Sequence, residues 1–302
     1  MRPRPVQGPV KLVSYRLPGH DVRAARYGVV REAGVVDAST RLGARYASLR
    51  DVLDADALDE LRRAVDGASP EHALDDVALL PPIPEPQKIF CIGVNYTDRN
   101  AEYRDGSDIP KYPSVFMRAP GSLVGHRAPI LRPPESEQLD YEGEIAIVIG
   151  KRGRRIPRER ARDHVAGLTC MNEGTIRDWL RHGKFNVTQG KNFVASGAIG
   201  PWIVTTDELP AFDDIRVTTR VNGEIRQHDT TANLAFPFDM LIAYLSRFAE
   251  LVPGDVIATG TPTGAGARFD PPRWLVPGDV VDVTVDHVGT LSNLVVDELS
   301  PA

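Results

Sequence analysis

Two glutamates separated by one residue, Glu142 and Glu144, open the apolar segment DYEGEIAIVIG at residues 140–150. On a β-strand these side chains share one face, which places the two carboxylates about 7 Å apart. Ala146 and Val148 continue that face as apolar residues, so we expect it to turn inward. Carboxylates at the end of a buried face need a cation or protons, and oxygen-only ligation suits Mg²⁺ or Mn²⁺. The solvated face of an amphipathic strand is the alternative interpretation.

A third acidic candidate is Glu173, which follows an apolar segment and precedes Arg177 by one helical turn. Taken alone, this stretch is also typical of an ordinary helix start. The segment GKNF at 190–193 carries Lys191, in a loop that leaves the lysine either solvated or functional. The glycine-rich segment 258–266 resembles a phosphate-binding loop, but it lacks the Lys-Ser/Thr ending and the helix that should follow. We therefore reject the interpretation of this segment as a phosphate-binding loop.

Elements that position these residues are predicted to be mostly strands, because short runs of Val, Ile and Thr alternate with Gly, Pro and Asp. Asn222-Gly223 predicts a type I′ hairpin. In the part of the chain that follows residue 86, helices are expected only at 161–165, 175–181 and 237–248, at the edges of a strand-rich domain. The predicted strands are IFCIGV, SVFMR, APILR, EIAIVIG, AGLTCMN, GPWIVT, IRVTTRVN, DVIATG, DVVDVTV and LSNLVVDEL.

The N-terminal part has a different pattern. Residues 11–38 predict a small strand meander, and residues 47–66 carry apolar side chains at helical spacing. The proline-rich segment at 79–86 is stiff and extended, which is typical of a boundary. We therefore predict a small N-terminal module at 1–82 and a main domain at 83–302.

Composition excludes several classes of protein. Of the 302 residues, 42% are hydrophobic and 25% charged, which is enough apolar material for a globular core. The net charge of −5 lacks the basic excess of a nucleic-acid binder. Two cysteines, Cys91 and Cys170, exclude a disulfide framework and favour a reducing compartment. Neither a signal peptide nor an apolar run of about 20 residues is present, so we expect a cytoplasmic protein with no membrane partner.

Seven short segments, in this order and spacing, resemble the fumarylacetoacetate hydrolase family over residues 83–298. The resemblance implies a strand-rich α+β fold, with a β-roll main domain and a small N-terminal strand and helix module. It also implies a homodimer and a divalent ion held by three carboxylates. The matching segments are GVNY at 93–96, YPSVFMR at 112–118, DYEGE at 140–144, NEGTIRD at 172–178, GKNF at 190–193, GPW at 200–202 and PGDVIATGTP at 253–262.

The resemblance also implies roles for individual residues. The metal ligands are Glu142, Glu144 and Glu173, although the family more often has Asp at the last position. The ion is Mg²⁺ or Mn²⁺, with Ca²⁺ as an alternative. The substrate is a small carboxylic acid, and a 2-oxo acid would chelate the ion through its carboxylate and keto oxygens. The residues implied to bind this substrate are Arg177, Lys191, Thr261, Tyr96 and Arg118, with Lys191 also catalytic.

The sequence departs from the family where hydrolytic members carry a His–Glu base pair on a lid helix. Glu102 is present, but Arg99 stands in the histidine position, and Leu180 replaces a frequent glutamine. An arginine remains protonated and cannot activate water, whereas it can bind a second substrate carboxylate. Of the histidines that might substitute for the missing base, His182 is favoured over His126 and His164. The predicted catalytic residues are therefore Glu102, Arg99 and His182 besides the lysine.

The leading functional hypothesis is metal-dependent C–C bond hydrolysis of an acylpyruvate-like 2-oxo or 1,3-diketo acid through a stabilised enolate, as in aromatic catabolism. A decarboxylase (a lyase) or an isomerase/tautomerase on the same metal site is the alternative, because neither reaction needs activated water. A metal-binding pseudoenzyme and a small-molecule binding protein are alternatives of a different class. The retained substrate-binding cations and the three clustered carboxylates argue against both.

Overall fold

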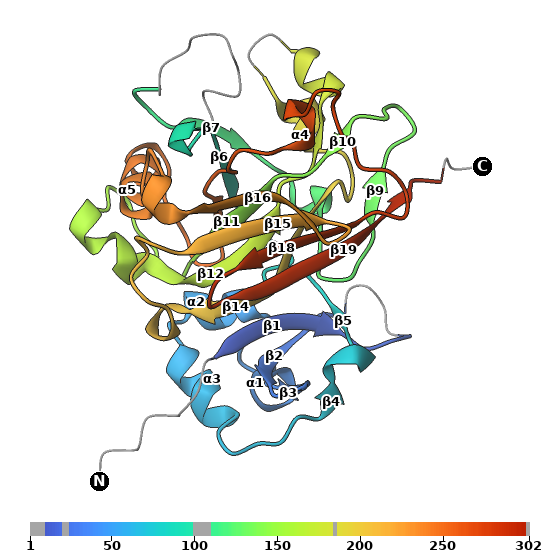
Figure 1. Cartoon of the computed structure of the whole chain (residues 1–302). Helices are drawn as coiled ribbons and strands as arrows, with labels where there is room; N and C mark the ends of the chain where they lie inside the picture. The colour runs from blue at the N-terminus through green and yellow to red at the C-terminus, as the bar shows by residue number, and fades with distance from the viewer. Residues whose placement is uncertain (1–9, 20–23, 99–109, 184–185, 300–302) are drawn as a thin grey trace.

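The computed structural model describes residues 10–19, 24–98, 110–183 and 186–299. It is a strand-rich α+β structure, as predicted (Figure 1). The strands are β1 (Lys11–Arg16), β2 (Arg26–Arg31), β3 (Gly34–Asp37), β4 (His72–Ala73), β5 (Ala78–Leu79), β6 (Ile89–Gly93), β7 (Ser114–Met117), β8 (Leu123–Val124), β9 (Ile130–Arg132), β10 (Leu139–Asp140), β11 (Gly143–Ile149), β12 (Val165–Asn172), β13 (Thr175–Ile176), β14 (Gly197–Thr205), β15 (Arg216–Val221), β16 (Glu224–Thr230), β17 (Val256–Ala258), β18 (Val280–Val285) and β19 (Gly289–Asp297).

The helices are short, except for one. The α-helices are α1 (Ser39–Leu42), α2 (Leu49–Asp54), α3 (Leu58–Ala64), α4 (Thr188–Lys191) and α5 (Phe238–Phe248). Segments of 3₁₀-helix cover Leu74–Asp76, Pro120–Ser122, Arg158–His164, Asp178–Arg181, Thr206–Glu208, Thr231–Asn233 and Gly266–Arg268. Within the described ranges, no helix is long and apolar enough to cross a membrane.

Strand β11 lies inside a twelve-stranded sheet with the order β4-β3-β2-β1-β14-β12-β11-β17-β6-β7. It pairs antiparallel with both β12 and β17, and all seven of its residues are buried. Ala146 and Val148 pack into one apolar cluster each, while Ile145, Ile147 and Ile149 pack into the largest core. The inward turn of the glutamate-bearing face is thereby confirmed, because a strand covered on both sides is apolar on both faces.

A second sheet, with the order β16-β15-β18-β19-β9, lies across β11 and β12 (Figure 1). Its inward side chains Val217, Val283 and Leu291 share one core cluster with Ile145 and Ile147. The two sheets approach most closely at Gly143, where an added Cβ atom would lie 1.9 Å from Thr219 Oγ1. The glycine between the two glutamates is therefore required by the packing of the sheets.

The N-terminal strands join the main sheet, because β1 pairs with β14 through Lys11↔Val204 and Leu12↔Ile203. Helices α2 and α3 confirm the helical spacing at 47–66, and their apolar faces share a core with Ile203. The described residues among the first 82 thus form strands and helices whose sheet and core continue into the rest of the chain. The boundary at residue 82 remains a prediction.

Several local predictions can be compared directly with the structure. The hairpin between β15 and β16 is confirmed, since Asn222 and Gly223 have φ of 52° and 82° as a type I′ turn requires. The helix at 237–248 is confirmed as α5, and that at 161–165 is a 3₁₀-helix. The helix predicted at 175–181 is wrong in its first part, because Thr175–Ile176 pairs with β10 as a strand. Likewise, the loop predicted around Lys191 contains α4.

Candidate active site

Glu142, Glu144 and Glu173 are brought together at the end of the β11–β12 pair. Glu142 and Glu144 flank Gly143, and Glu173 follows Asn172, so the register Gly143↔Asn172 places the three glutamates side by side. The Glu173 N–H donates to the Glu142 carbonyl oxygen at 2.7 Å. All three side chains are buried, and each offers a carboxylate oxygen within 4.8 Å of the other two. Oxygen donors of this number and closeness fit a hard divalent cation with water or substrate completing its coordination. The three glutamates thus form a candidate divalent-cation site.

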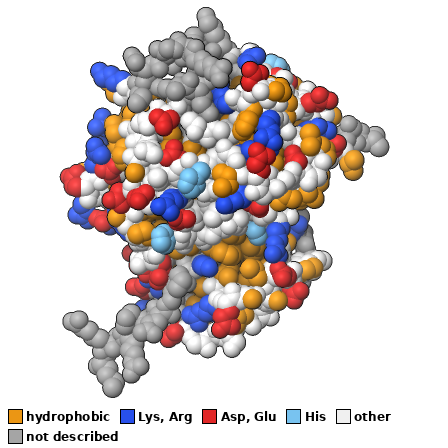
Figure 2. All heavy atoms as spheres, viewed as in Figure 1, with side chains coloured by type: hydrophobic (Ala, Val, Ile, Leu, Met, Phe, Trp, Pro, Cys, Tyr) orange, Lys and Arg blue, Asp and Glu red, His pale blue; other side chains and the backbone are white. Residues whose placement is uncertain are grey.

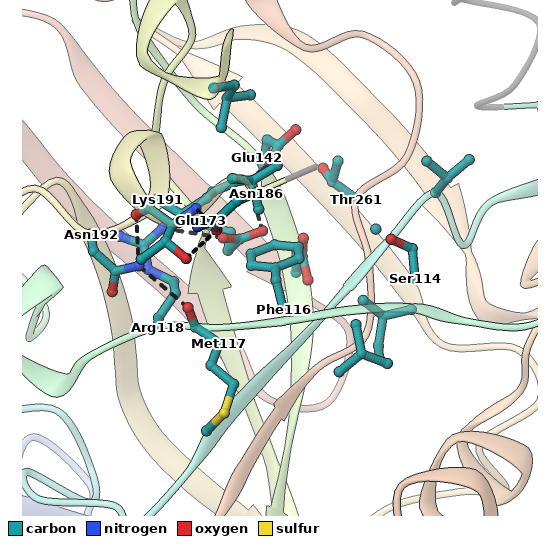
Figure 3. A pocket seen from close by; sticks show the side chains of 18 of the residues that line it. Ser114, Phe116, Met117, Arg118, Glu142, Glu173, Asn186, Lys191, Asn192 and Thr261 are labelled. Atoms are coloured by element: carbon teal, nitrogen blue, oxygen red, sulfur yellow. Dashed lines mark hydrogen bonds and ion pairs between the residues drawn. The ribbon is translucent and has the colours of Figure 1, made fainter. Parts of the chain in front are cut away.

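Two of the three carboxylates have buried cationic partners (Figure 3). Lys191 Nζ donates to Glu142 at 2.5 Å and to Glu173 at 2.9 Å, and Arg118 donates to Glu173 at 3.2 Å. Burial lowers the pKa of the Lys191 ammonium, but attraction to Glu142 and Glu173 outweighs it and raises the pKa above its ordinary value. Lys191 therefore stands as a protonated group at the centre of the site.

Glu144 differs from the other two carboxylates. Its side chain accepts the Gly260 N–H at 2.7 Å, and within the described part of the chain no cation pairs with it. Burial, followed by repulsion from Glu173 and Glu142, raises its pKa well above the usual range. A bound divalent cation would remove this cost, so Glu144 is the ligand that most depends on one.

Arg177, predicted to hold the substrate, lines the cavity and is anchored on one side. Its Nε donates to Asp140 at 2.7 Å, and one terminal nitrogen donates to Glu142 at 2.8 Å. Asp140 also accepts the N–H groups of Gly266 and Ala267, at 2.8 and 3.0 Å. Asp140 was not identified from the sequence, yet it holds both Arg177 and the loop that follows Thr261.

Thr261 also lines the cavity, and its hydroxyl donates to the Gly143 carbonyl oxygen at 3.0 Å. The Thr261 hydroxyl oxygen in turn accepts a hydrogen bond from Gln227 Nε2 at 2.8 Å. Gln227 belongs to β16 and is the one buried residue of that strand. The strand does not alternate between buried and exposed residues, since Ile225 on the same parity is exposed, so no local pattern in the sequence identifies Gln227.

Two residues predicted to bind substrate are engaged differently. Tyr96 lies in the hydrophobic core, is absent from the cavity lining, and its hydroxyl has no partner in the described structure. Arg118 reaches the cavity, but its five N–H groups are directed to protein acceptors. These acceptors are Ser122 Oγ, the Ser122 and Gly174 carbonyl oxygens, Ser196 Oγ and Glu173 Oε1. Tyr96 thus packs in the core and Arg118 holds Glu173, while a role of either residue in substrate binding remains a prediction.

The predicted bases are not brought to the carboxylates in the described structure. His182 is exposed and packs on Trp179, with ring centroids 4.2 Å apart, outside the cavity lining. Arg99 and Glu102 lie outside the described residues, so their predicted roles remain predictions. Acid–base chemistry must therefore be argued from the lining that the structure shows.

The cavity above the glutamates has a volume of about 870 Å³. Its described lining contains the three glutamates, Arg118, Arg177, Lys191 and Thr261, but no histidine. Phe116 forms one wall, with its ring centroid 5.1 Å from Lys191 Nζ, and Leu180 lines the position where the family often has glutamine. The site combines acidic ligands, buried cations and an apolar wall, which suits a small carboxylic acid.

Comparison with known proteins agrees with this site. The family model described as "Fumarylacetoacetate (FAA) hydrolase C-terminal" matches residues 88–296. The chain is 44% identical over 225 residues to oxaloacetate tautomerase YisK of Bacillus subtilis, covering 74% of each chain. It is 41% identical over 244 residues to the mitochondrial oxaloacetate tautomerase fahd2 of Xenopus laevis, covering 80% of this chain and 75% of that one.

A solved structure matches with a TM-score of 0.78 and 28% identity, covering 96% of this chain and all of the other. It is maleylpyruvate hydrolase from Sphingobium sp. SYK-6, in complex with manganese(II) and pyruvate. The chain therefore belongs to the fumarylacetoacetate hydrolase family, which confirms the resemblance noted in the sequence. It is an enzyme, and its acidic triad could hold a divalent metal.

Proposed function

We propose that this enzyme is a metal-dependent tautomerase of a small 2-oxo dicarboxylic acid, with oxaloacetate as the first candidate. The observation that carries the proposal is the lining of the cavity, in which Lys191 is paired to two ligand carboxylates and no described histidine could activate water. Keto–enol interconversion needs a proton to move between carbon and oxygen, without an attacking water. Two curated relatives named as oxaloacetate tautomerases support the same choice over C–C hydrolysis.

The three glutamates would hold the divalent cation, and the cation would stabilise negative charge on the keto oxygen of the substrate. Arg177 is held by Asp140 and Glu142 through Nε and one terminal nitrogen, which leaves donors directed at the cavity for a substrate carboxylate. Phe116 and Leu180 cover the site with apolar surface. Water exclusion by these side chains favours proton transfer over hydrolysis.

Lys191 is the proton carrier in this proposal. For conversion of enol to keto, its ammonium gives a proton to C3 of the enol, and the enol hydroxyl returns a proton to the resulting amine. The net change is one proton moved from oxygen to carbon, and the lysine ends in its starting state. The raised pKa keeps this lysine protonated at neutral pH, as the first step requires.

The test follows the ultraviolet absorbance of enol-oxaloacetate with Mg²⁺ or Mn²⁺ present, while a coupled lactate dehydrogenase assay detects any pyruvate. We expect the enol signal to decay faster than the uncatalysed background without pyruvate release. Lys191→Met should lower kcat/KM at least about 100-fold, the usual contribution of an acid–base group. Lys111→Met is the matched control, because Lys111 is exposed and lies outside the cavity lining.

Two results would overturn the proposal. One is pyruvate release at the rate of enol loss, which would indicate decarboxylation. The other is an equal effect of Lys191→Met and Lys111→Met, which would remove the lysine from the mechanism. Circular dichroism of both variants establishes that the comparison is made between folded proteins.

Hydrolysis of an acylpyruvate is the second candidate, favoured by the likeness to maleylpyruvate hydrolase. Arg99 argues against it, because a guanidinium remains protonated and cannot act as a base. If the wild type cleaves acylpyruvates efficiently and Arg99→His gives no increase, this argument fails and hydrolysis becomes the preferred function. We further propose a cytoplasmic homodimer, with residues 83–302 as the catalytic part.

A further inference from the structure

Gln227 comes from the second sheet, yet its amide reaches the strand and the loop that form the active site. Its Oε1 accepts the Gly143 N–H at 2.9 Å. Its Nε2 donates to Thr261 Oγ1 at 2.8 Å and to the Pro262 carbonyl oxygen at 2.9 Å. The Gln227 side chain is 1% exposed, so water does not compete for these hydrogen bonds.

The orientation of this amide is fixed by its neighbours. Rotating it by 180° would set Nε2 against the Gly143 N–H, which are two donors, and Oε1 against the Pro262 carbonyl oxygen, which are two acceptors. A hydrogen-bond network of this kind decides the orientation of an amide. Gln227 therefore presents a donor, and never an acceptor, to the Thr261 hydroxyl.

This direction determines what Thr261 can offer. A hydroxyl has one hydrogen, and an oxygen that accepts from Gln227 must direct that hydrogen elsewhere. In the ligand-free structure the hydrogen goes to the Gly143 carbonyl oxygen, at 3.0 Å. A substrate carboxylate accepts hydrogen bonds only, so it needs this hydrogen and would be repelled by a lone pair.

We propose that Gln227 is a positioning residue that sets the Thr261 hydroxyl as a hydrogen-bond donor to the substrate carboxylate. The inference rests on the proposed 2-oxo acid substrate and adds a residue from the opposite sheet to its recognition. On binding, Thr261 exchanges the Gly143 carbonyl oxygen for a carboxylate oxygen, while Gln227 keeps its contacts. The narrow approach of the two sheets at Gly143 is what allows Gln227 to reach the site.

A double-mutant cycle tests this role, with pyruvate as the probe and Mg²⁺-loaded enzyme. Calorimetry measures pyruvate affinity for the wild type, Gln227→Met, Thr261→Val and the double variant. A hydrogen bond to a charged group is lost in each single variant, so each should bind pyruvate about tenfold more weakly. The double variant should also be about tenfold weaker, because Gln227 acts only through the hydroxyl. Thr261→Ser keeps the hydroxyl and should restore binding.

Multiplication of the two single effects in the double variant would overturn the proposal, since it would indicate a general structural role. Unchanged affinity in Thr261→Val would also overturn it. If Gln227→Met does not fold, Gln227→Glu replaces it, because a glutamate keeps the acceptor for Gly143 but lacks the amide hydrogens. Full pyruvate affinity in that variant would count against the proposal.

The outcome is separable from the proposed function. KM and kcat for oxaloacetate are measured on the same variants, and we expect KM to rise while kcat changes less. If the wild type does not interconvert oxaloacetate tautomers but the pyruvate cycle behaves as described, the tautomerase proposal fails and the role of Gln227 stands. If the wild type interconverts oxaloacetate tautomers but the two single effects multiply in the double variant, the tautomerase proposal stands and the role of Gln227 fails.

Discussion

Replacing Glu142 or Glu144 by glutamine should change the stability of the metal-free protein in opposite directions, although the two residues are separated only by Gly143. Glu142 accepts hydrogen bonds from Arg177 and Lys191, so its loss leaves two buried cations with one partner fewer. Within the described structure Glu144 accepts a hydrogen bond from the Gly260 backbone N–H, and its charge is disfavoured in the folded state. Glutamine keeps an oxygen for that N–H and removes the charge.

The expected magnitudes follow from chain length. A chain of 302 residues unfolds with an entropy of about 0.6 kcal/mol per kelvin, so 1 kcal/mol corresponds to about 1.6 °C in Tm. Breaking a buried ion pair costs about 3–5 kcal/mol, which predicts a fall of about 5–8 °C for Glu142→Gln. Removing the raised-pKa carboxyl should leave Tm unchanged or up to about 3 °C higher for Glu144→Gln.

Metal should then place the wild type above both variants in stability. Mn²⁺ at a hundredfold excess over its Kd stabilises the wild type by about 2.7 kcal/mol, or about 4 °C. Both variants should lose most of this increase, because each lacks one ligand carboxylate. Differential scanning calorimetry at pH 7, with chelator or with Mn²⁺, measures all six values. Equal falls in Tm for the two variants in chelator would refute the assignment of Glu144 as the ligand that most depends on a cation. A full increase in Tm with Mn²⁺ for Glu144→Gln would refute it as well.

Four other outcomes are expected. Gly143→Ala should lower the free energy of unfolding by about 1–3 kcal/mol, because its Cβ would meet Thr219 Oγ1. Adding Thr219→Ala to that variant should restore part of the lost free energy. Chemical denaturation measures both values. Burial lowers the pKa of His126 to about 4. The unfolded chain therefore binds one more proton between about pH 6.5 and pH 4, and stability falls through that window by up to about 1.4 kcal/mol per pH unit. A His126→Gln variant with the same acid slope would contradict this. Asp140→Asn should raise KM about tenfold by releasing Arg177, and an unchanged KM would exclude that link. Sedimentation should give a homodimer of twice the 33.1 kDa chain mass, and a stable monomer would exclude it.

The sequence was most informative where periodicity and charge act within one element. The alternation around β11 predicted the burial of the face that carries Glu144, Ala146 and Val148, because it follows from the two-residue period of a strand, and Glu142, just before β11, is buried beside it. Glu173 could be grouped with them only through the family resemblance. The register that brings it there is set by the pairing of β11 with β12, which no local pattern specifies.

Local sequence does not specify tertiary placement. Tyr96 and Arg118 stand in segments that match the family, but a motif does not state whether a side chain faces the cavity or the core. The segment at 175–181 carries helix-compatible residues, yet Thr175–Ile176 pairs with β10 because tertiary pairing outweighs weak local propensity. Gln227 lies far along the chain from the glutamates, and only the packing of the sheets brings it to them.

The charge on the face shown in Figure 2 agrees with a small-molecule enzyme. Basic and acidic side chains are interspersed there. Ion pairs also link surface side chains of the described chain, such as Arg158 and Asp239 at 2.9 Å. A mixed surface of this kind lacks the single-sign field that steers a polyanion. The unbalanced electrostatics are instead concentrated inside, where three carboxylates and three cations meet at the base of the cavity.

The five residues of the segment Asp140-Tyr141-Glu142-Gly143-Glu144 each have a physical reason once both sheets are considered. Asp140 holds Arg177 and two loop amides, and the Tyr141 hydroxyl donates to the Gly264 carbonyl oxygen at 2.9 Å, so this pair ties the metal strand to the loop after Thr261. The two glutamates supply the ligands, and only glycine leaves room between them for the second sheet. A larger residue there would separate the sheets and withdraw Gln227 from the loop. The motif therefore limits how closely the two sheets approach, and in the recognition proposed above Gln227 would reach Thr261 only through that approach.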